Sequence, residues 1–562
     1  MSFRRPTWFA SRSAQAVFVA VLVSGLSAQV SDLRPQGGVP EDWTHHRIRF
    51  STAALHQHPE LAAREPRAVA QLYREAFAQA RALMTSAQPS SQASAGVTDP
   101  HRDWSVSLGS GRIQFGQFPA KWNSDPNAPV TAANCTTDFV IYALNVSGVT
   151  GGQPSIVGLN RLYSDGATPR CSGLQPNFMF SYNTTTVANG RILTSPVLSL
   201  DGKKVAFVET STVAGTRTSV LHVLNIATSG SQVTASPSSL PPAGAMTSTT
   251  IAAASNTRSS PWVDYPSDTA YVGLDNGILY KITGVFKGTP TLVTTAPWPI
   301  TINLNSSFAS PILDNTTGNV FLGAGNGRLY SVNVNTPGPV TTIQIGRTGA
   351  NNPNIWDSPI FDATGKTLFA ITSNDAVLTG AAVVQVDSSL KTVITRVLVG
   401  LGSTAGATVN LYDGDFDDAY FTNPANGHML VCGTGATDTS PYRYLLGFNA
   451  GGVLQPGSSV QITTDATARC SPVTEYLNPN IGGGTDFFFW GVTRSCPGIA
   501  APGGCVMALT NESALASARA LGGSSGIVID NDYVTMTGGS SIYFSTEANP
   551  LNAVKLTQQG LQ

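Results

Sequence analysis

A short motif returns at intervals of about 55 residues through most of this 562-residue chain. It reads Ser-Pro-x-x-Asp and stands before a β-run at 260–264, 310–314 and 358–362. Incomplete copies complete the series, and they lie at 195–199, 409–413, 471–475 and 526–530. Repeats of this length are typical of propellers and solenoids, in which each unit buries its apolar face only against its neighbours.

The content of one unit separates these two architectures. The unit that opens at Ser260 contains four β-runs, and Asn276-Gly277 stands between the second and third as a type I′ hairpin signal. The pairs Asn326-Gly327 and Asn426-Gly427 are expected at the same place in later units. Four-stranded antiparallel units in a radial array are the blades of a β-propeller, so the sequence predicts an all-β propeller.

The blade number follows from how the ring closes. The last unit offers three strands, whereas residues 104–108 form a strand that belongs to no unit. Pairing this strand with the last blade removes two exposed edges and gives a propeller over 103–562 with eight blades. Seven blades with longer loops are the alternative.

The first hundred residues differ from the repeats. Residues 1–28 have basic residues, an apolar run and small residues before a cleavage site, which is the pattern of a signal peptide. Residues 29–102 read as an extension, with a helix over 66–84 and a linker over 86–96. No later stretch has 18 apolar residues, so no transmembrane segment is expected after signal removal. A secreted, periplasmic or cell-envelope location follows.

Six cysteines lie beyond this signal, and an even number in an exported chain favours disulfides over catalytic thiols. Fifteen pairings are open. If local pairing prevails, the bonds join Cys135 to Cys171, Cys432 to Cys470 and Cys496 to Cys505, and free buried thiols are the alternative.

Charge excludes one class of partner. The chain has 32 Lys and Arg against 33 Asp and Glu, and only 12% of its residues are charged. A net charge of −1 gives no electrostatic reason to expect nucleic acid or an anionic membrane as partner.

The pattern Ser-Pro-x-x-Asp followed by Tyr-Val-Gly-x-x-x-Gly-x-Leu-Tyr, best at 260–280, resembles the repeats of quinoprotein-like (PQQ-like) β-propellers. The blocks 138–145 and 259–265 also look like uncharacterised secreted bacterial propeller proteins. Resemblance to the quinoprotein dehydrogenases implies a PQQ cofactor, a calcium ion and usually a vicinal disulfide. No two cysteines are adjacent here, and no residue maps onto the family's docking motifs, so PQQ is not expected.

Acids recur at the end of the expected innermost strand of successive blades, and they are Asp264, Asp314, Asp362, Asp413, Glu475 and Asp530. They could form a ring of carboxylates at one mouth of the channel, ready for a cation or a basic ligand. The favoured interpretation is that they accept backbone N–H groups within turns.

The densest acidic cluster suggests a metal site. Asp413, Asp415 and Asp417 alternate along a short loop, and such carboxylates can converge on Ca²⁺. The positions that an EF-hand gives to glycine and glutamate hold Asp418 and Pro424, so a solvated turn is the alternative.

Other candidate residues are aromatic or imidazole side chains. Trp122, Trp262, Trp356 and Trp490 could stack on sugars, although core packing is expected of them. His45, His46, His56 and His58 could hold a metal but are expected on a polar surface, and His222 and His428 are expected to be packed and hydrogen-bonded.

These observations favour an exported, disulfide-linked propeller that acts as a binding or scaffold module for a protein or glycan. The alternative is a secreted enzyme with its site in the central channel, either a PQQ-type oxidoreductase or a polysaccharide-active propeller. No common hydrolase, nucleotide or zincin motif occurs in the sequence.

Overall fold

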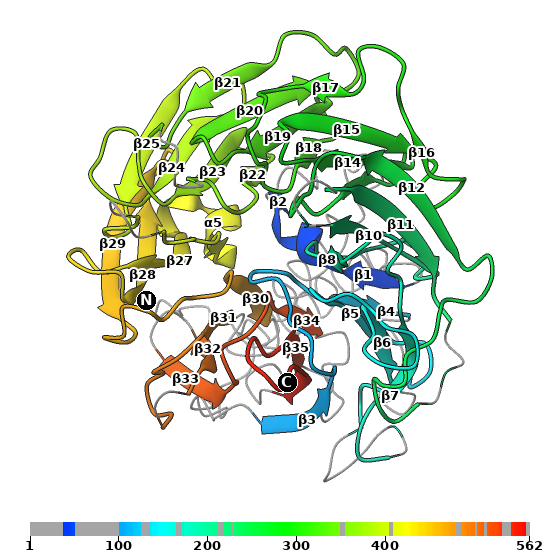
Figure 1. The fold of residues 1–562 in the computed structure, drawn as a ribbon. Coiled ribbons are helices and arrows are strands. Elements are labelled where there is room, and N and C mark those ends of the chain that lie inside the picture. The colour runs from blue at the N-terminus through cyan, green and yellow to red at the C-terminus, as the bar shows by residue number, and fades with distance from the viewer. Residues whose placement is uncertain are drawn as a thin grey trace, which may run out of the picture.

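Eight β-sheets stand in a ring around a central channel, so the expected eight-bladed propeller is confirmed (Figure 1). The structure is a computed structural model. It describes residues 38–50, 101–124, 134–164, 171, 173–211, 213, 217–227, 230, 232–348, 354–403, 408–478, 485–500, 503–510, 514–530 and 541–557. The expected signal peptide, the helix over 66–84 and the linker lie outside these residues.

The first four blades run from cyan to yellow-green in Figure 1. Blade 1 contains β4 (Ala120–Asn123), β5 (Phe139–Ala143), β6 (Ile156–Asn160) and β7 (Asn177–Tyr182). Blade 2 contains β8 (Gly190–Ile192), β9 (Val197–Leu198), β10 (Lys204–Ser211), β11 (Ser219–Asn225) and β12 (Met246–Ala252). Blade 3 contains β13 (Trp262–Asp264), β14 (Thr269–Gly273), β15 (Ile278–Thr283), β16 (Thr291–Leu292) and β17 (Ile300–Thr301). Blade 4 contains β18 (Ile312–Asp314), β19 (Asn319–Gly323), β20 (Arg328–Asn333) and β21 (Thr341–Gln344).

The last four blades complete the ring. Blade 5 contains β22 (Ile360–Asp362), β23 (Thr367–Thr372), β24 (Ala382–Asp387) and β25 (Val393–Leu398). Blade 6 contains β26 (Asp415–Phe416), β27 (His428–Thr434), β28 (Pro441–Phe448) and β29 (Leu454–Gln461), with α5 (Asp418–Thr422) and η2 (Pro424–Asn426) between its first two strands. Blade 7 contains β30 (Thr474–Asn478), β31 (Thr485–Val492), β32 (Cys505–Thr510) and β33 (Ala514–Arg519). Blade 8 contains β34 (Val528–Asp530), β35 (Ser541–Ser545), β36 (Asn552–Thr557) and β3 (His101–Ser107).

Blade 8 joins the two ends of the ring. Strand β3 pairs antiparallel with β36, so the strand expected at 104–108 becomes the outermost strand of the last blade. Lys555 and Asp103 form a buried ion pair across this junction, with Nζ and Oδ2 2.6 Å apart. This pairing joins the first and the last strand of the propeller in one blade and so closes the ring.

Two of the three hairpin turns expected at Asn-Gly pairs are confirmed. Gly277 and Gly327 have φ of +79° and +78° between the second and third strands of blades 3 and 4, a conformation that favours glycine. The expectation for Asn426-Gly427 was wrong. Gly427 lies between the first two strands of blade 6 with φ −88°, because α5 and η2 extend that connection.

The serine of the Ser-Pro motif connects neighbouring blades. The Oγ atoms of Ser195, Ser260 and Ser310 accept N–H groups from the preceding blade, donated by Phe118 (3.0 Å), Ser195 (2.8 Å) and Ser260 (2.8 Å). In these three blades the motif serine therefore satisfies a backbone donor of the blade before it.

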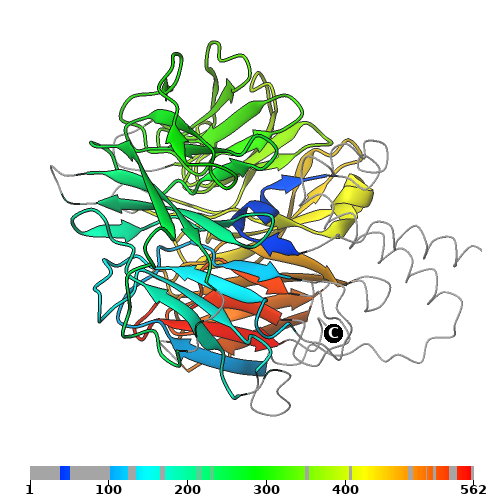
Figure 2. The same cartoon turned by 90° about the vertical axis from the view of Figure 1, so that its right-hand side faces the viewer.

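The segment 38–50 lies inside the ring (Figures 1 and 2). Strand β1 (Val39–Glu41) pairs antiparallel with β4 of blade 1, η1 (Trp43–His46) follows, and β2 (Ile48–Arg49) pairs parallel with β22 of blade 5. Blades 1 and 5 are opposite in a ring of eight, so this segment crosses the channel from one side to the other. Its side chains are buried, whereas the sequence set residues 29–102 apart as an extension before the propeller.

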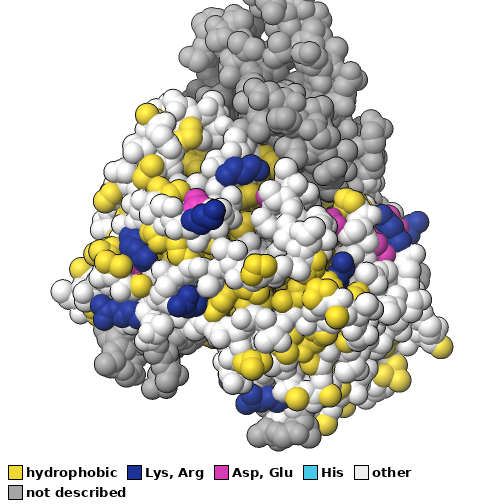
Figure 3. All heavy atoms as spheres, turned by 90° about the horizontal axis from the view of Figure 1, so that it is seen from above, with side chains coloured by type: hydrophobic (Ala, Val, Ile, Leu, Met, Phe, Trp, Pro, Cys, Tyr) yellow, Lys and Arg dark blue, Asp and Glu magenta, His cyan; other side chains and the backbone are white. Residues whose placement is uncertain are grey.

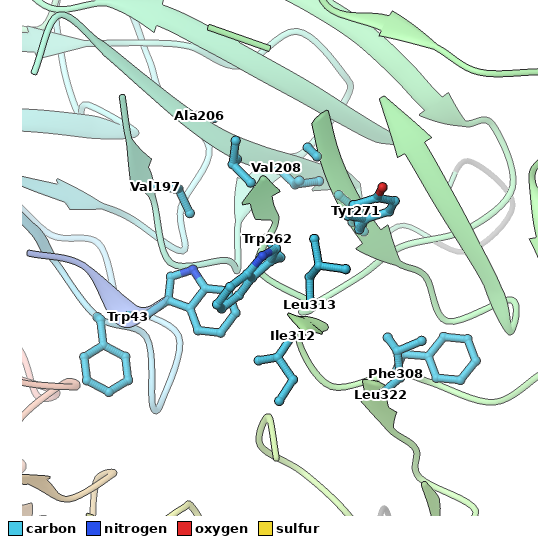
Figure 4. Close-up of a cluster of buried hydrophobic side chains, with 14 of the residues drawn as sticks. Trp43, Val197, Ala206, Val208, Trp262, Tyr271, Phe308, Ile312, Leu313 and Leu322 are labelled. Carbon is cyan, nitrogen blue, oxygen red and sulfur yellow. The ribbon is translucent and has the colours of Figure 1, made fainter. Parts of the chain in front are cut away.

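Large apolar side chains fill the space between the blades and this segment. Trp43 of η1 points toward Trp262 of β13, with ring centroids 5.9 Å apart and planes at 79° (Figure 4). Both rings are buried, and they join the core that runs through blade 8 and blades 1 to 5. The crossing segment is thus part of the propeller core.

The three disulfides follow the local pairing, with bonds Cys135–Cys171, Cys432–Cys470 and Cys496–Cys505. No helix among the described residues combines the length and apolar character needed to cross a membrane. Figure 3 shows a face on which charged side chains are scattered among uncharged ones, in keeping with the low charge content.

Candidate functional site

Arg47 lies in the channel between two carboxylates. Its Nη2 donates to Asp357 and its Nη1 to Asp413, each at 2.9 Å, and all three side chains are largely buried. Burial disfavours the charge on Arg47, but Asp357, Asp413 and Asp415 outweigh burial and raise its pKa. The guanidinium therefore stays charged and neutralises acids from blades 5 and 6.

Arg49 makes the second set of ion pairs. Its Nη2 lies 2.6 Å from Asp415 and 3.8 Å from Glu475, and the imidazole of His46 lies 3.9 Å from Asp415. Burial raises the pKa of Glu475 well above its ordinary value, and Asp486 adds to this shift while Arg49 opposes it. The channel side of blades 6 and 7 is thus acidic, and the crossing segment supplies the cations.

The strand register of blade 6 explains why these acids face the channel. Asp415 pairs with Leu430 and Asp417 donates its N–H to His428, just as Trp262 and Asp264 pair with the second strand of blade 3. Asp413 therefore takes the place of the motif serine, four residues before the place that the sequence spacing predicted. Its carboxylate lies where other blades present a serine hydroxyl.

The calcium hypothesis names these same residues. Asp413 and Asp415 contact Arg47 and Arg49, while Asp417 caps α5 by accepting Tyr420 N–H at 3.1 Å and lies 3.1 Å from the His428 ring. Among the described residues no group of three or more His, Cys, Asp or Glu could hold a metal ion. Binding of calcium by Asp413, Asp415 and Asp417 stays a prediction.

The other recurring acids have structural contacts. Asp314 and Asp362 accept turn N–H groups, from Thr316 at 2.9 Å and from Gly365 at 2.8 Å. Asp264 accepts the hydroxyl of Ser267 in the corresponding turn. Asp530 instead forms a fully buried ion pair with Lys121, with Oδ2 and Nζ 2.9 Å apart.

A pocket opens at the mouth of the channel where the inner strands begin. Its volume is about 610 Å³, counted with the space open to solvent. Trp43 and Arg47 of the crossing segment line it, and so do residues four positions before the first residue of the inner strand in five blades, namely Gly116, Leu193, Arg258, Phe308 and Trp356.

One wall of this pocket is an aromatic and cationic cluster. The Arg258 guanidinium lies 3.7 Å from the ring centroid of Trp356, and Trp356 Nε1 donates to the Tyr412 hydroxyl at 2.9 Å. That hydroxyl donates to the Phe115 carbonyl at 3.1 Å, and burial raises the pKa of Tyr412 well above its ordinary value. The phenol is therefore neutral and both aromatic rings are held in place.

Of the four candidate tryptophans, Trp356 lines the pocket, with one face covered by Arg258. Trp122, Trp262 and Trp490 are buried, as expected of core residues. The sequence analysis missed Arg258 and Phe308 as pocket residues. Both stand two residues before a motif serine, and a comparison of this position across the repeats would have identified them.

The prediction for His45 and His46 was wrong, whereas the prediction for His222 is confirmed. His45 and His46 were expected on a polar surface, but each is 6% exposed because η1 lies within the channel. His222 contacts Glu209 at 2.9 Å and Ser248 at 2.8 Å, as expected of a packed strand histidine. His56 and His58 lie outside the described residues.

Comparisons with known proteins complete this description. No protein-family model and no curated protein matches the sequence. Among solved structures, the chain is similar to a crystal structure described as a putative 6-phosphogluconolactonase from Bacteroides fragilis, with 10% identity, 70% of this chain and 98% of that chain covered, and a TM-score of 0.39. A similarity of this size carries no argument about function, and the resemblance to quinoprotein-like repeats stays a prediction.

Proposed function

We propose that the protein is a binding module that holds a small polar group, such as the end residue of a glycan or peptide, in the pocket at the mouth of the channel. The pocket lining carries this proposal. It combines aromatic rings, hydroxyls and two arginines, of which Arg47 is ion-paired to Asp357 and Asp413.

The same lining favours binding over catalysis. It contains neither histidine, lysine nor cysteine, and Asp357 is ion-paired to Arg47. The motif serines Ser195, Ser260 and Ser310 accept backbone N–H groups, and the carboxylate of Asp357 is bonded to Arg47 rather than to these hydroxyls. Binding therefore needs fewer assumptions than turnover.

The alternative is an enzyme whose site lies deeper in the channel. Such a site would need the space in which Trp43, His46, Arg47 and Arg49 are packed against the blades. The occupied channel thus favours the mouth over the interior as the place of ligand binding.

An extracellular or cell-envelope location belongs to the same proposal. Three disulfides support it, because such bonds persist in oxidising compartments. A binding module with an exposed pocket and few surface charges suits this location.

Arrays of glycans and peptides, probed with the purified protein, test the proposal. We expect a set of ligands to bind the wild type, to be lost in Ser307→Trp, which fills the pocket, and to be retained in Val233→Trp, whose side chain is exposed and outside the lining. Mass spectrometry should recover each ligand unchanged after incubation. Binding that Ser307→Trp leaves intact, or conversion of a ligand to product, would contradict the proposal.

A further inference from the structure

Arg258 stands out among the arginines around the channel because no carboxylate pairs with it. Among the described residues it makes neither a hydrogen bond nor an ion pair, and its guanidinium lies 3.7 Å from the ring centroid of Trp356. A guanidinium has five N–H donors, and leaving them without acceptors away from bulk water is unfavourable. Its donors are therefore available to a ligand in the pocket.

The position of Arg258 is set before any ligand arrives. Trp356, on which it lies, is fixed by its hydrogen bond to Tyr412, and Tyr412 by its bond to the Phe115 carbonyl. A cation over an indole face is attracted electrostatically by the ring quadrupole, so the Arg258 side chain is already ordered before a ligand binds. Preorganisation of this kind lowers the entropic cost of binding.

Further donors line the same pocket. Ser195 and Ser260 use their oxygen atoms to accept backbone N–H groups, so their hydroxyl protons can be donated. Trp43 is 2% exposed, and its Nε1 has no hydrogen-bond partner among the described residues. The pocket thus presents neutral donors and, in Arg258, a guanidinium that is not paired with a carboxylate among the described residues.

The nearby acids do not cancel this charge. Asp357 is ion-paired to Arg47. Asp275 attracts Arg258 electrostatically but is not in ion-pair contact with it in the described part of the chain. Burial raises the pKa of Glu547, a neighbour of Tyr412, well above its ordinary value and so disfavours the negative charge of this side chain.

We infer that the pocket is an oxyanion site in which Arg258 receives a carboxylate or phosphate group of the ligand. A planar guanidinium matches either group with two parallel hydrogen bonds. The inference rests on the proposed function, since it names the chemical class that the mouth pocket binds.

Calorimetric titration of the purified protein with three probes tests it: D-glucuronate for a carboxylate, inorganic phosphate for a phosphate and D-glucose as the neutral reference. We expect at least one anionic probe to bind more tightly than glucose, with affinity that falls as salt is added. Arg258→Gln should weaken that probe about 10- to 100-fold, since a charge-assisted bond is lost. Arg258→Lys should retain part of the affinity, because it keeps the charge without the fork.

Lys281 offers a matched control, since its Nζ lies 5.5 Å from the ring centroid of Trp298 and neither residue lines the pocket. Lys281→Gln should leave binding unchanged. Equal affinity of Arg258→Gln and wild type for the anionic probes would overturn the inference, and binding of neutral array ligands that Ser307→Trp abolishes would then leave the proposed function standing. Failure of every array ligand to bind would instead count against the proposed function itself.

Discussion

Two arginines line the same pocket in opposite surroundings. Arg47, in the floor, is 2% exposed and bonded to Asp357 and Asp413, whereas Arg258, in the wall, is partly buried and rests on an indole with no carboxylate partner in the described part of the chain. Burial lowers the pKa of Arg258, and Asp275 opposes this shift, while the acids around Arg47 raise its pKa. The contrast separates a cation that stabilises the channel from a cation left for a ligand.

The same substitution at both positions tests this contrast most strongly. Arg47→Met should lower the free energy of unfolding by about 3–5 kcal/mol, because it leaves buried acids without their counter-charge. Arg258→Met should change it by less than about 1 kcal/mol, since no ion pair is lost. Urea unfolding followed by circular dichroism measures both. Equal losses in the two variants would show that Arg258 is a structural residue.

These two arginines also show what the sequence could and could not predict. The repeat predicted the blades because each unit contacts mainly its neighbours, so local spacing carries the information. Arg47 contacts Asp413 across 366 positions, and nothing in the 38–50 stretch resembles the repeat, so its place in the channel could not be predicted from spacing. Asp413 was misplaced for a related reason, because blade 6 lacks the Ser-Pro pair that sets the register elsewhere.

The acids of blades 6 and 7 extend this contrast between paired and unpaired charges. Arg47 and Arg49 do not neutralise all of these acids, and Asp486 is the example. Burial raises the pKa of Asp486 to about 6, with Asp417 adding to the shift and the Asp418 N–H opposing it. The native state then binds a proton between about pH 6 and pH 4 that an unfolded aspartate does not bind, so this group makes the protein more stable as pH falls through that window.

Asp486→Asn should remove this dependence. The change keeps an oxygen for the Asp418 N–H, which now bonds to Oδ1 at 2.9 Å, and it removes the charge. The wild type should gain about 2–3 kcal/mol more than the variant between pH 7.5 and pH 4, measured by urea unfolding at each pH. As a control, Asp387→Asn should leave the slope between pH 5 and pH 7.5 unchanged, because hydrogen bonds lower the pKa of Asp387 despite some burial. An unchanged slope in Asp486→Asn would contradict the assignment.

The smallest effect is expected from added calcium. This experiment tests whether Arg47 and Arg49 already neutralise the carboxylates that would bind the metal ion. Calcium at 100 times its Kd would add about 2.7 kcal/mol to the stability of a protein with a free site. We expect the wild-type melting temperature to be the same with calcium and with a chelator, because Asp413 and Asp415 are bonded to guanidinium groups. In Arg49→Gln, which frees Asp415 and Glu475, calcium should recover part of the lost stability. A chelator-sensitive wild type whose sensitivity Asp415→Asn abolishes would instead establish a calcium site in blade 6 and assign Arg49 a role beside the metal.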